Sequence, residues 1–248
     1  MENRACVMCN NCEEIYNTNV KLYGLNIFLF ETKNFMVNID TYPVSKNHIL
    51  IIPKYHFCSF SSIDIEKKDE LQYIINHLFV IFKIDDYIMF EHGTNIIDEK
   101  NKICGNSIFH AHLHIIPNIT INENTILQNL KLNKNKTIDD YSIENLGNKY
   151  LLNVIKYDLP TKNNYLLFIN KYKYYCIPDT DIDGDIESQF FRKLISVYFN
   201  NGVYNWKDKE NFEKNKEIYM SNILRTIKEF GENNKDLIQK KNYQLLIF

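Results

Sequence analysis

Three histidines stand within five residues of this chain, at His110, His112 and His114. Ala111 and Leu113 separate them, and this alternation predicts a strand, whose period of two would place all three imidazoles on one face. Imidazole is the side chain whose ordinary pKa lies nearest to neutral pH. Three imidazoles on a common face therefore indicate either a metal site or a cluster of acid, base and nucleophile.

Three of the six cysteines, Cys6, Cys9 and Cys12, form two overlapping C-x-x-C pairs near the N-terminus. The first residues lack the apolar core of a signal peptide, and no apolar run approaches the roughly 18 residues that cross a bilayer. We therefore expect a cytoplasmic protein without a membrane partner. In that compartment the cysteines are thiols or metal ligands rather than disulfides.

The composition is ordinary for a globular protein, because 45% of the 248 residues are hydrophobic and the formal net charge is −2. A chain of this length fits one large domain or two small ones. The small negative charge provides no general attraction for polyanions, so long nucleic acid is not an expected partner.

The apolar patterns around the histidines predict a sheet covered by a helix, and this framework would position the imidazoles. An amphipathic pattern over residues 64–82 predicts a helix whose apolar stripe covers the sheet, with His77 on its polar, surface side. The polar stretch 93–102 is expected to form a loop at the entrance of the site. Short apolar runs predict strands over residues 27–31, 35–39, 48–53, 87–90 and 108–116.

A polar segment rich in Asn and Lys, between residues 118 and 147, marks the main predicted boundary. We expect a catalytic domain over residues 1–120, a linker over 121–149 and a mixed strand and helix half over 150–248. In the second half, apolar runs predict strands at 150–157, 165–170 and 172–177, and helical spacing predicts helices near 186–199 and 211–230. Its apolar end, residues 243–248, is expected to dock on the fold.

Two blocks of this sequence resemble the signature of the histidine-triad (HIT) superfamily. Residues 105–116 carry Gly-x-Ser-x-x-His-x-His-x-His followed by two aliphatic residues. Residues 40–56 are similar to the upstream segment of the family, in which an Asp-x-x-Pro turn leads through His-x-Leu to Pro-Lys-x-His. Two ordered blocks are more specific than either alone. The resemblance covers residues 6–117, with Asn47 where many relatives carry Gly and a long insertion between Gly93 and Cys104.

The resemblance implies an α+β fold, with a HIT-like antiparallel sheet of about five strands and a covering helix. Simple HIT domains commonly pair as dimers through adjoining sheets. The second α/β half could therefore be a degenerate HIT-like copy that completes such a sheet within one chain, as an intramolecular pseudo-dimer. The alternative is an ordinary homodimer in which each chain carries an appendage.

The same resemblance implies a nucleotidyl hydrolase or transferase that acts on a nucleoside 5′-phosphate derivative, with His112 as the nucleophile. Attack on the α-phosphorus would give a covalent nucleotidyl-histidine. Asp40 matches the acidic residue that binds the ribose hydroxyls in the family. The phosphoryl oxygens would accept hydrogen bonds from His114, Ser107 and the amides of Gly105 and Asn106.

Four further residues are weaker candidates. His92 stands where a polar pocket residue is expected, although a plain packing role is equally consistent with its position. His48 is expected to serve packing and backbone hydrogen bonds rather than chemistry. Gln189 and Arg192 could meet a phosphate or leaving group near the start of a helix, but placement at the surface is the plainer expectation.

Some branches of the family carry structural zinc, and the resemblance implies a tetrahedral site made of two thiolates and two imidazoles. His110 is thus a candidate for the catalytic cluster and, under this interpretation, a zinc ligand beside the nucleophile, where the metal would fix the strand that carries His112. The preferred ligands are Cys6, Cys9, His56 and His110, and the pair Cys9 with Cys12 stays open as an alternative.

The leading hypothesis is an enzyme of nucleotidyl transfer on a dinucleoside polyphosphate, a nucleoside phosphoramidate or a nucleotide sugar. Water, phosphate or another phosphorylated compound could accept the nucleotide. Two hypotheses from other classes stand beside it: a nucleotide-binding module without turnover, and a zinc-stabilised scaffold for a protein partner.

Overall fold

The computed structural model describes residues 6, 8–9, 21–22, 24–95, 108, 110–119, 121, 128–133, 136–144, 159–184, 186–199, 202, 205 and 207–239. Its main feature is one eight-stranded sheet in which all neighbours are antiparallel, in the order β3-β4-β5-β7-β6-β9-β10-β8. The strands are β3 (Phe28–Glu31), β4 (Phe35–Ile39), β5 (Ile49–Pro53), β6 (Tyr87–Gly93), β7 (Leu113–Pro117), β8 (Ser142–Glu144), β9 (Tyr165–Asn170) and β10 (Lys173–Pro178). A separate hairpin pairs β1 (Lys21–Leu22) with β2 (Leu25–Asn26).

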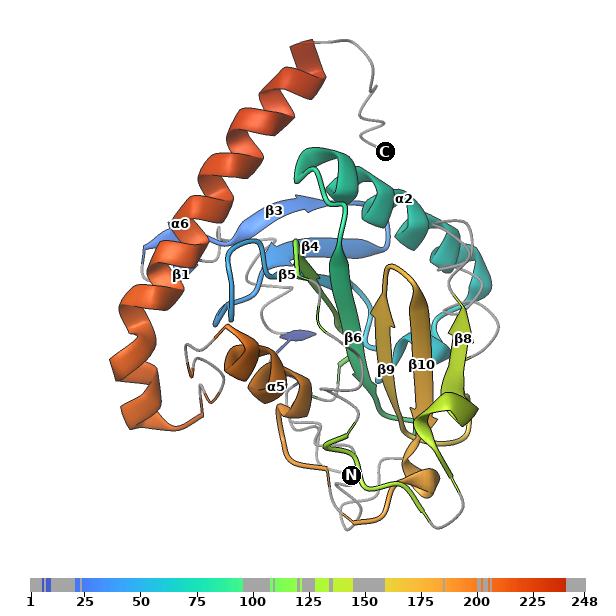
Figure 1. The fold of residues 1–248 in the computed structure, drawn as a ribbon. Helices are drawn as coiled ribbons and strands as arrows, with labels where there is room; N and C mark the ends of the chain where they lie inside the picture. Colours follow the sequence, from blue (N-terminus) through green and yellow to red (C-terminus); the bar gives the residue numbers. More distant parts are fainter. Residues whose placement is uncertain are drawn as a thin grey trace.

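Helices cover both faces of the sheet (Figure 1). Alternate residues of each strand point to opposite faces, so Leu113 and Ile115 of β7 pack with helix α2 (Ile65–Ile81), while Ile116 packs with helix α5 (Phe190–Tyr198). The long helix α6 (Lys209–Gln239) runs beside β3 and β4, where Ile223 packs against Ile39. Short 3₁₀ turns lie at Phe60–Ser62, Ile138–Tyr141 and Asp179–Asp181.

The two halves of the chain share this sheet without a break. Strand β6 pairs with β9 from Ile88 opposite Asn170 to Gly93 opposite Tyr165. On either side of this junction the order is the same, because β5-β7-β6 on one side is matched by β8-β10-β9 on the other. The predicted α+β fold with an antiparallel sheet and a covering helix is confirmed. The degenerate-copy origin of the second half, and the proposed domain bounds, stay predictions.

Several predicted elements differ from the structure in length. The strand predicted over residues 108–116 is shorter, because β7 begins only at Leu113. Helix α6 extends from Lys209 to Gln239, beyond the predicted 211–230, because residues 231–239 are mostly polar and carry too few apolar residues for a periodic pattern. Residues 150–157, 96–102 and 243–248, for which a strand, part of a loop and a docked tail are predicted, lie outside the described residues.

The prediction that His77 lies at the surface is wrong, because its exposed fraction is 5%. Its ring stacks on Tyr73 and meets the edge of Phe30, at centroid distances of 5.9 and 5.3 Å. Phe30 in turn stacks on Phe230 of α6. The side of α2 that carries His77 is therefore covered by Phe30 of β3, and Phe230 of α6 stacks on that ring in turn.

Candidate functional site

The histidine cluster divides into two parts in the structure. The rings of His112 and His114 lie together, with centroids 5.0 Å apart. The ring of His110 instead meets His56 edge to face at 5.2 Å. Because β7 begins at Leu113, His110 and His112 precede the strand, and the three imidazoles do not share one uniform environment.

The hydrogen bond made by His112 fixes which of its ring nitrogens carries a proton. Nδ1 of His112 lies 2.7 Å from the carbonyl oxygen of His110. A carbonyl only accepts, so Nδ1 is the protonated donor and Nε2 keeps its lone pair. Burial lowers the pKa of His112, which favours this neutral form at physiological pH. The ring is therefore prepared to act as a nucleophile through Nε2.

His114 is held by His48, a residue for which the sequence predicts packing and backbone hydrogen bonds rather than a contact with another histidine. The backbone N–H of Val44 donates to Nδ1 of His48 at 3.3 Å, so the proton of neutral His48 lies on Nε2. Nε2 of His48 is 2.8 Å from Nδ1 of His114 and donates to it. The proton of His114 then lies on its Nε2. Burial lowers the pKa of His48 to about 4 and that of His114 well below its ordinary value.

Asp40 lies inside this arrangement and is only 4% exposed. Its Oδ1 accepts the N–H of Tyr42 at 2.7 Å, and its Oδ2 accepts Nη1 of Arg192 at 2.7 Å. The expectation that Gln189 and Arg192 lie at the surface is wrong, because they are 8% and 5% exposed. Helix α5 packs on this face of the sheet and carries Arg192 to the carboxylate, which local sequence patterns do not reveal.

A second cluster lies at the other end of the histidine segment. Sγ of Cys9 is 3.3 Å from Nδ1 of His56 and 3.5 Å from Nδ1 of His110, and Sγ of Cys6 is also 3.5 Å from the latter. All four ligand atoms lie within 4.8 Å of one another. Zinc–sulfur and zinc–nitrogen bonds of ordinary length place tetrahedral ligands about 3.6 Å apart, so this spacing fits the metal. These residues form a candidate metal site.

The protonation of His110 agrees with a ligand role. Its Nε2 lies 2.8 Å from the carbonyl oxygen of Pro53, so Nε2 is the donor and Nδ1 presents its lone pair toward the two thiols. Cys58, which the sequence does not single out, lies 3.8 Å from Nε2 of His56. Cys12, the alternative partner of Cys9, lies outside the described residues.

The remaining predicted residues have different outcomes. Gly105, Asn106 and Ser107 lie outside the described residues, so their contacts with phosphate stay predictions. His92 is half-buried, and its ring meets Phe191 of α5 edge to face at 5.2 Å. The C-terminal half therefore reaches the side of the sheet that carries His114, which stacks on Phe90 at 4.3 Å.

A buried carboxyl on the opposite face is a feature that the sequence does not indicate. Oε2 of Glu91 accepts the hydroxyl of Tyr165 at 2.6 Å, and Oε1 accepts the N–H of Phe60 at 2.9 Å. Burial raises the pKa of Glu91 to about 7, although both hydrogen bonds oppose this shift. These side chains belong to the face covered by α2, so they support the sheet beneath the histidines.

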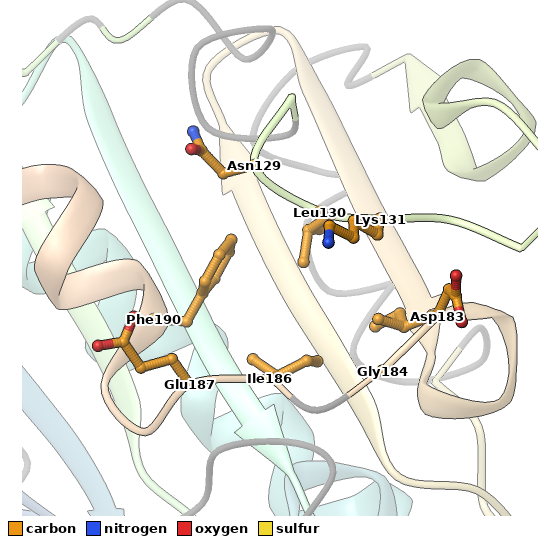
Figure 2. A pocket seen from close by; sticks show the side chains of 9 residues that line it. Asn129, Leu130, Lys131, Asp183, Gly184, Ile186, Glu187 and Phe190 are labelled. Carbon is orange, nitrogen blue, oxygen red and sulfur yellow. The ribbon is translucent and has the colours of Figure 1, made fainter.

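A cavity of about 310 Å³ lies at the start of α5. Figure 2 shows side chains from residues 129–131 on one side of it and from residues 183–190 on the other. Its lining mixes apolar residues such as Leu130, Ile186 and Phe190 with the charged Lys131, Asp183 and Glu187. The predicted histidines, cysteines and Asp40 do not line it, so it is separate from the candidate site.

Comparison with known proteins matches the part of the chain that carries Asp40, His48 and the three clustered histidines. The family model described as the HIT domain matches residues 26–120. A HIT-like protein of Chlamydia muridarum is 32% identical over 36% of this chain and 68% of its own length. A protein named adenosine 5′-monophosphoramidase, from Saccharomyces cerevisiae, is 29% identical over 46% of this chain and 62% of its own length.

A solved structure gives a further match. It is described as a hypothetical histidine triad nucleotide-binding protein from Sulfolobus tokodaii, and it is 30% identical, with coverage of 46% of this chain and 71% of that one and a TM-score of 0.34. Within the described part of the present chain, no helix is both long and apolar enough to cross a bilayer.

Proposed function

Since this chain belongs to the histidine-triad (HIT) family, we propose that it cleaves a nucleoside 5′-phosphate derivative through a covalent intermediate on His112. The observation that carries the proposal is the hydrogen bond from Nδ1 of His112 to the carbonyl of His110, which leaves Nε2 unprotonated. A nucleoside phosphoramidate is the first substrate to consider, because the yeast relative is named for that activity. Dinucleoside polyphosphates and nucleotide sugars have the same α-phosphate.

In the proposed first step, the lone pair on Nε2 of His112 forms a bond to the α-phosphorus. The bond from phosphorus to the leaving group breaks, and the leaving group keeps that electron pair and takes up a proton. In the second step a water oxygen attacks the phosphorus, loses a proton and displaces the histidine. The products are the nucleoside 5′-monophosphate and the regenerated His112. Phosphate in place of water would give a phosphorylase instead.

His114 supports the reaction by donating rather than by attacking. Because Nδ1 of His114 accepts from His48, its proton lies on Nε2 and is available to a phosphoryl oxygen. Such a donor stabilises the charge that develops on the oxygens in the transition state. The amides of Gly105 and Asn106 and the hydroxyl of Ser107 have the same role in the proposal, and His92 is a further candidate contact of the nucleotide.

We also propose that Cys6, Cys9, His56 and His110 hold a structural zinc ion. The spacing of the four ligand atoms and the free lone pair on Nδ1 of His110 support it. When bound, the metal would fix the N-terminal segment to the chain just before the nucleophile. His110 would then position His112 through its own carbonyl, and it would not touch the substrate.

The test compares the wild type with His112→Asn on adenosine 5′-phosphoramidate, diadenosine polyphosphate and a nucleotide sugar, with and without phosphate. The Asn amide can replace Nδ1–H of His112 but has no atom in place of Nε2, so we expect turnover to fall by about 10³-fold or more. A nucleotidyl adduct on the His112 peptide should appear after rapid quenching of the wild type. Full turnover by His112→Asn would show that the mechanism is wrong.

The same measurements separate the second candidate function. A nucleotide-binding module of this fold would bind adenosine 5′-monophosphate saturably, without turnover and without an adduct. A scaffold stabilised by zinc would neither bind adenosine 5′-monophosphate nor turn over a nucleotide substrate. Its only ligand-dependent property would be the stability that the metal confers.

A further inference from the structure

Helix α6, which lies outside the matched HIT domain, holds the turn that joins β4 to β5. Nδ2 of Asn222 donates to the carbonyl oxygen of Pro43 at 3.2 Å. One turn later along the helix, Oγ1 of Thr226 accepts the backbone N–H of Asn47 at 2.8 Å. Asn222, Thr226 and Asn47 are 9%, 0% and 3% exposed, so these hydrogen bonds are shielded from solvent.

The carbonyl that Asn222 binds belongs to the same peptide unit as the N–H of Val44. A peptide unit is planar and trans, so the C=O of Pro43 and the N–H of Val44 point in opposite directions and cannot turn independently. This N–H donates to Nδ1 of His48 at 3.3 Å, which is long for a hydrogen bond and therefore sensitive to alignment. Asn222 and His48 thus bind the two sides of one peptide unit.

A chain of hydrogen bonds therefore leads from α6 to the histidine pair. The N–H of Val44 places the proton of His48 on Nε2, and this nitrogen lies 2.8 Å from Nδ1 of His114. Nε2 of His114 then carries the proton that the proposed function directs to a phosphoryl oxygen. Both histidines are buried, and hydrogen bonds linked in this way polarise one another.

The backbone at Asn47, directly before His48, explains why the turn needs a hold from outside. Asn47 has a φ of +62°, in the left-handed region that residues with a Cβ adopt only at a cost. Its N–H is bound by Thr226, and its Nδ2 donates to Oε2 of Glu229 at 3.1 Å. The hydroxyl proton of Thr226 goes to the carbonyl of Asn222 at 2.8 Å, so Oγ1 is left to accept from Asn47. Helix α6 thus binds both ends of the turn.

We propose that Asn222 is a positioning residue of the reaction, because through the Pro43–Val44 peptide it sets which nitrogen of His48 faces His114 with a proton. This inference rests on the proposed function only for the use of the His114 proton. It gives the C-terminal half a part in the chemistry, although residues 115–248 contain no histidine. Asn222 acts through His48 and does not touch the substrate.

The first test compares two asparagines of α6 that each donate to one backbone carbonyl. Asn222→Leu has nearly the same shape as the wild type but cannot donate to Pro43. Asn233→Leu is the matched control, because Nδ2 of Asn233 donates at 2.7 Å to the carbonyl of Ile81, at the end of α2. Nitrogen NMR of the histidine rings at neutral pH shows which ring nitrogen carries the proton, and it needs no turnover.

The wild type and Asn233→Leu should show His48 and His114 protonated on Nε2. Asn222→Leu should show a second form of His48, protonated on Nδ1, because the N–H of Val44 is no longer held toward that nitrogen. Wild-type ring forms in folded Asn222→Leu would overturn the proposal. So would a wild type in which His48 is protonated on Nδ1.

The second test is kinetic and uses adenosine 5′-phosphoramidate. Asn222→Leu should lower kcat by about fivefold or more and change KM by less than about twofold, because the lost hydrogen bond displaces a donor that acts in the transition state. Asn233→Leu should keep both constants even if it melts at a lower temperature. An unchanged kcat in Asn222→Leu would overturn the proposal, because α6 would then only pack on the turn.

Thr226 provides a second pair of variants that decides the matter if Asn222→Leu does not fold. Thr226→Val keeps the shape but cannot accept the N–H of Asn47, whereas Thr226→Ser can. Thr226→Val should show the Nδ1-protonated form of His48 and a lower kcat, and Thr226→Ser should restore both. Equal spectra for Thr226→Val and wild type would overturn the proposal. If the wild type turns over no nucleotide, the proposed function fails, and the NMR comparison still tests the role of α6.

Discussion

Nε2 of His48 lies 2.8 Å from Nδ1 of His114, in a fully buried contact between the chain just before β5 and strand β7. The N–H of Val44 sets the proton of His48 on Nε2, and His48 in turn sets the proton of His114 on its outer nitrogen. The state of a proposed catalytic donor therefore depends on a backbone amide 70 residues earlier in the chain.

Replacing His48 should impair the reaction without abolishing substrate binding. His48→Phe keeps an aromatic ring but removes the donor to His114, so we expect kcat to fall by about 10- to 100-fold with a smaller change in KM. His48→Gln is the matched control, because its amide can donate toward Nδ1 of His114 and should restore part of kcat. Steady-state kinetics on an accepted nucleotide measures both, and equal kcat for wild type and His48→Phe would contradict the prediction.

The protein as purified should contain about one zinc ion per chain, because two thiolates and two imidazoles complete a closed tetrahedral site. Cys6→Ser combined with Cys9→Ser should release the metal and lower the melting temperature. Cys176→Ser, a thiol in β10 away from the cluster, should keep the metal. Metal analysis by mass spectrometry decides: zinc retained by the double variant, or none in wild type, would refute the assignment.

Gly93→Ala should destabilise the fold, because a Cβ at Gly93 would lie 2.1 Å from Cζ of Tyr165. Tyr165 is fully buried and donates its hydroxyl to Glu91, so its ring cannot move aside. Such overpacking costs about 1–3 kcal/mol or more. Gly231→Ala in α6 is the control, since its Cβ meets nothing within 4 Å and should stabilise the helix by about 0.5–1 kcal/mol. Urea unfolding gives both values.

The stability difference between Glu91→Gln and wild type should depend on pH. Burial raises the pKa of Glu91 to about 7 in the folded state from an ordinary 4.5, so the folded state holds this proton more firmly. Its contribution to stability is complete below the unfolded pKa and is lost as pH rises through about 7. Relative to wild type, the variant should therefore gain stability between pH 5 and 8, by at most about 3 kcal/mol.

Titration of the buried histidines does not change the stability difference between Glu91→Gln and wild type. The pKa of His48 is lowered to about 4, so its contribution to stability is present above the unfolded pKa and is lost as pH falls toward 4. That slope is common to wild type and Glu91→Gln and cancels in their difference. Glu217→Gln, which removes an exposed carboxyl of α6, controls for net charge. If the difference in unfolding free energy between Glu91→Gln and wild type stays constant with pH, the pKa of Glu91 is not raised by folding.

The chain should be a monomer in solution. The outer edge of β6 is paired with β9 along six residues, so its backbone groups are unavailable to a second copy. Light scattering after size exclusion should give the mass of one chain at micromolar concentration. A stable dimer would favour the alternative of an ordinary homodimer with a C-terminal appendage.

The family and the candidate chemistry could be predicted from the sequence, because both depend on residues close together in the chain. The spacing of His110, His112 and His114 and the C-x-x-C pair were enough to name a nucleophile and a metal site as hypotheses. The apolar patterns were enough to predict helix α2 and the strands of the sheet other than β8, which lies within the segment predicted to be a linker. Alternation and helical periodicity are local properties, so they can be read without knowledge of the fold.

The groups that surround the histidines became visible in the folded chain alone. Arg192 reaches Asp40 across 152 positions, and His48 meets His114 across 66. No spacing rule connects such residues, because the contact arises when the antiparallel sheet and α5 bring distant segments together. The same reason accounts for His77, whose polar position on α2 is buried beside Phe30 of β3. Burial and charge pairing are long-range properties, and they set the proton positions on which the proposed chemistry depends.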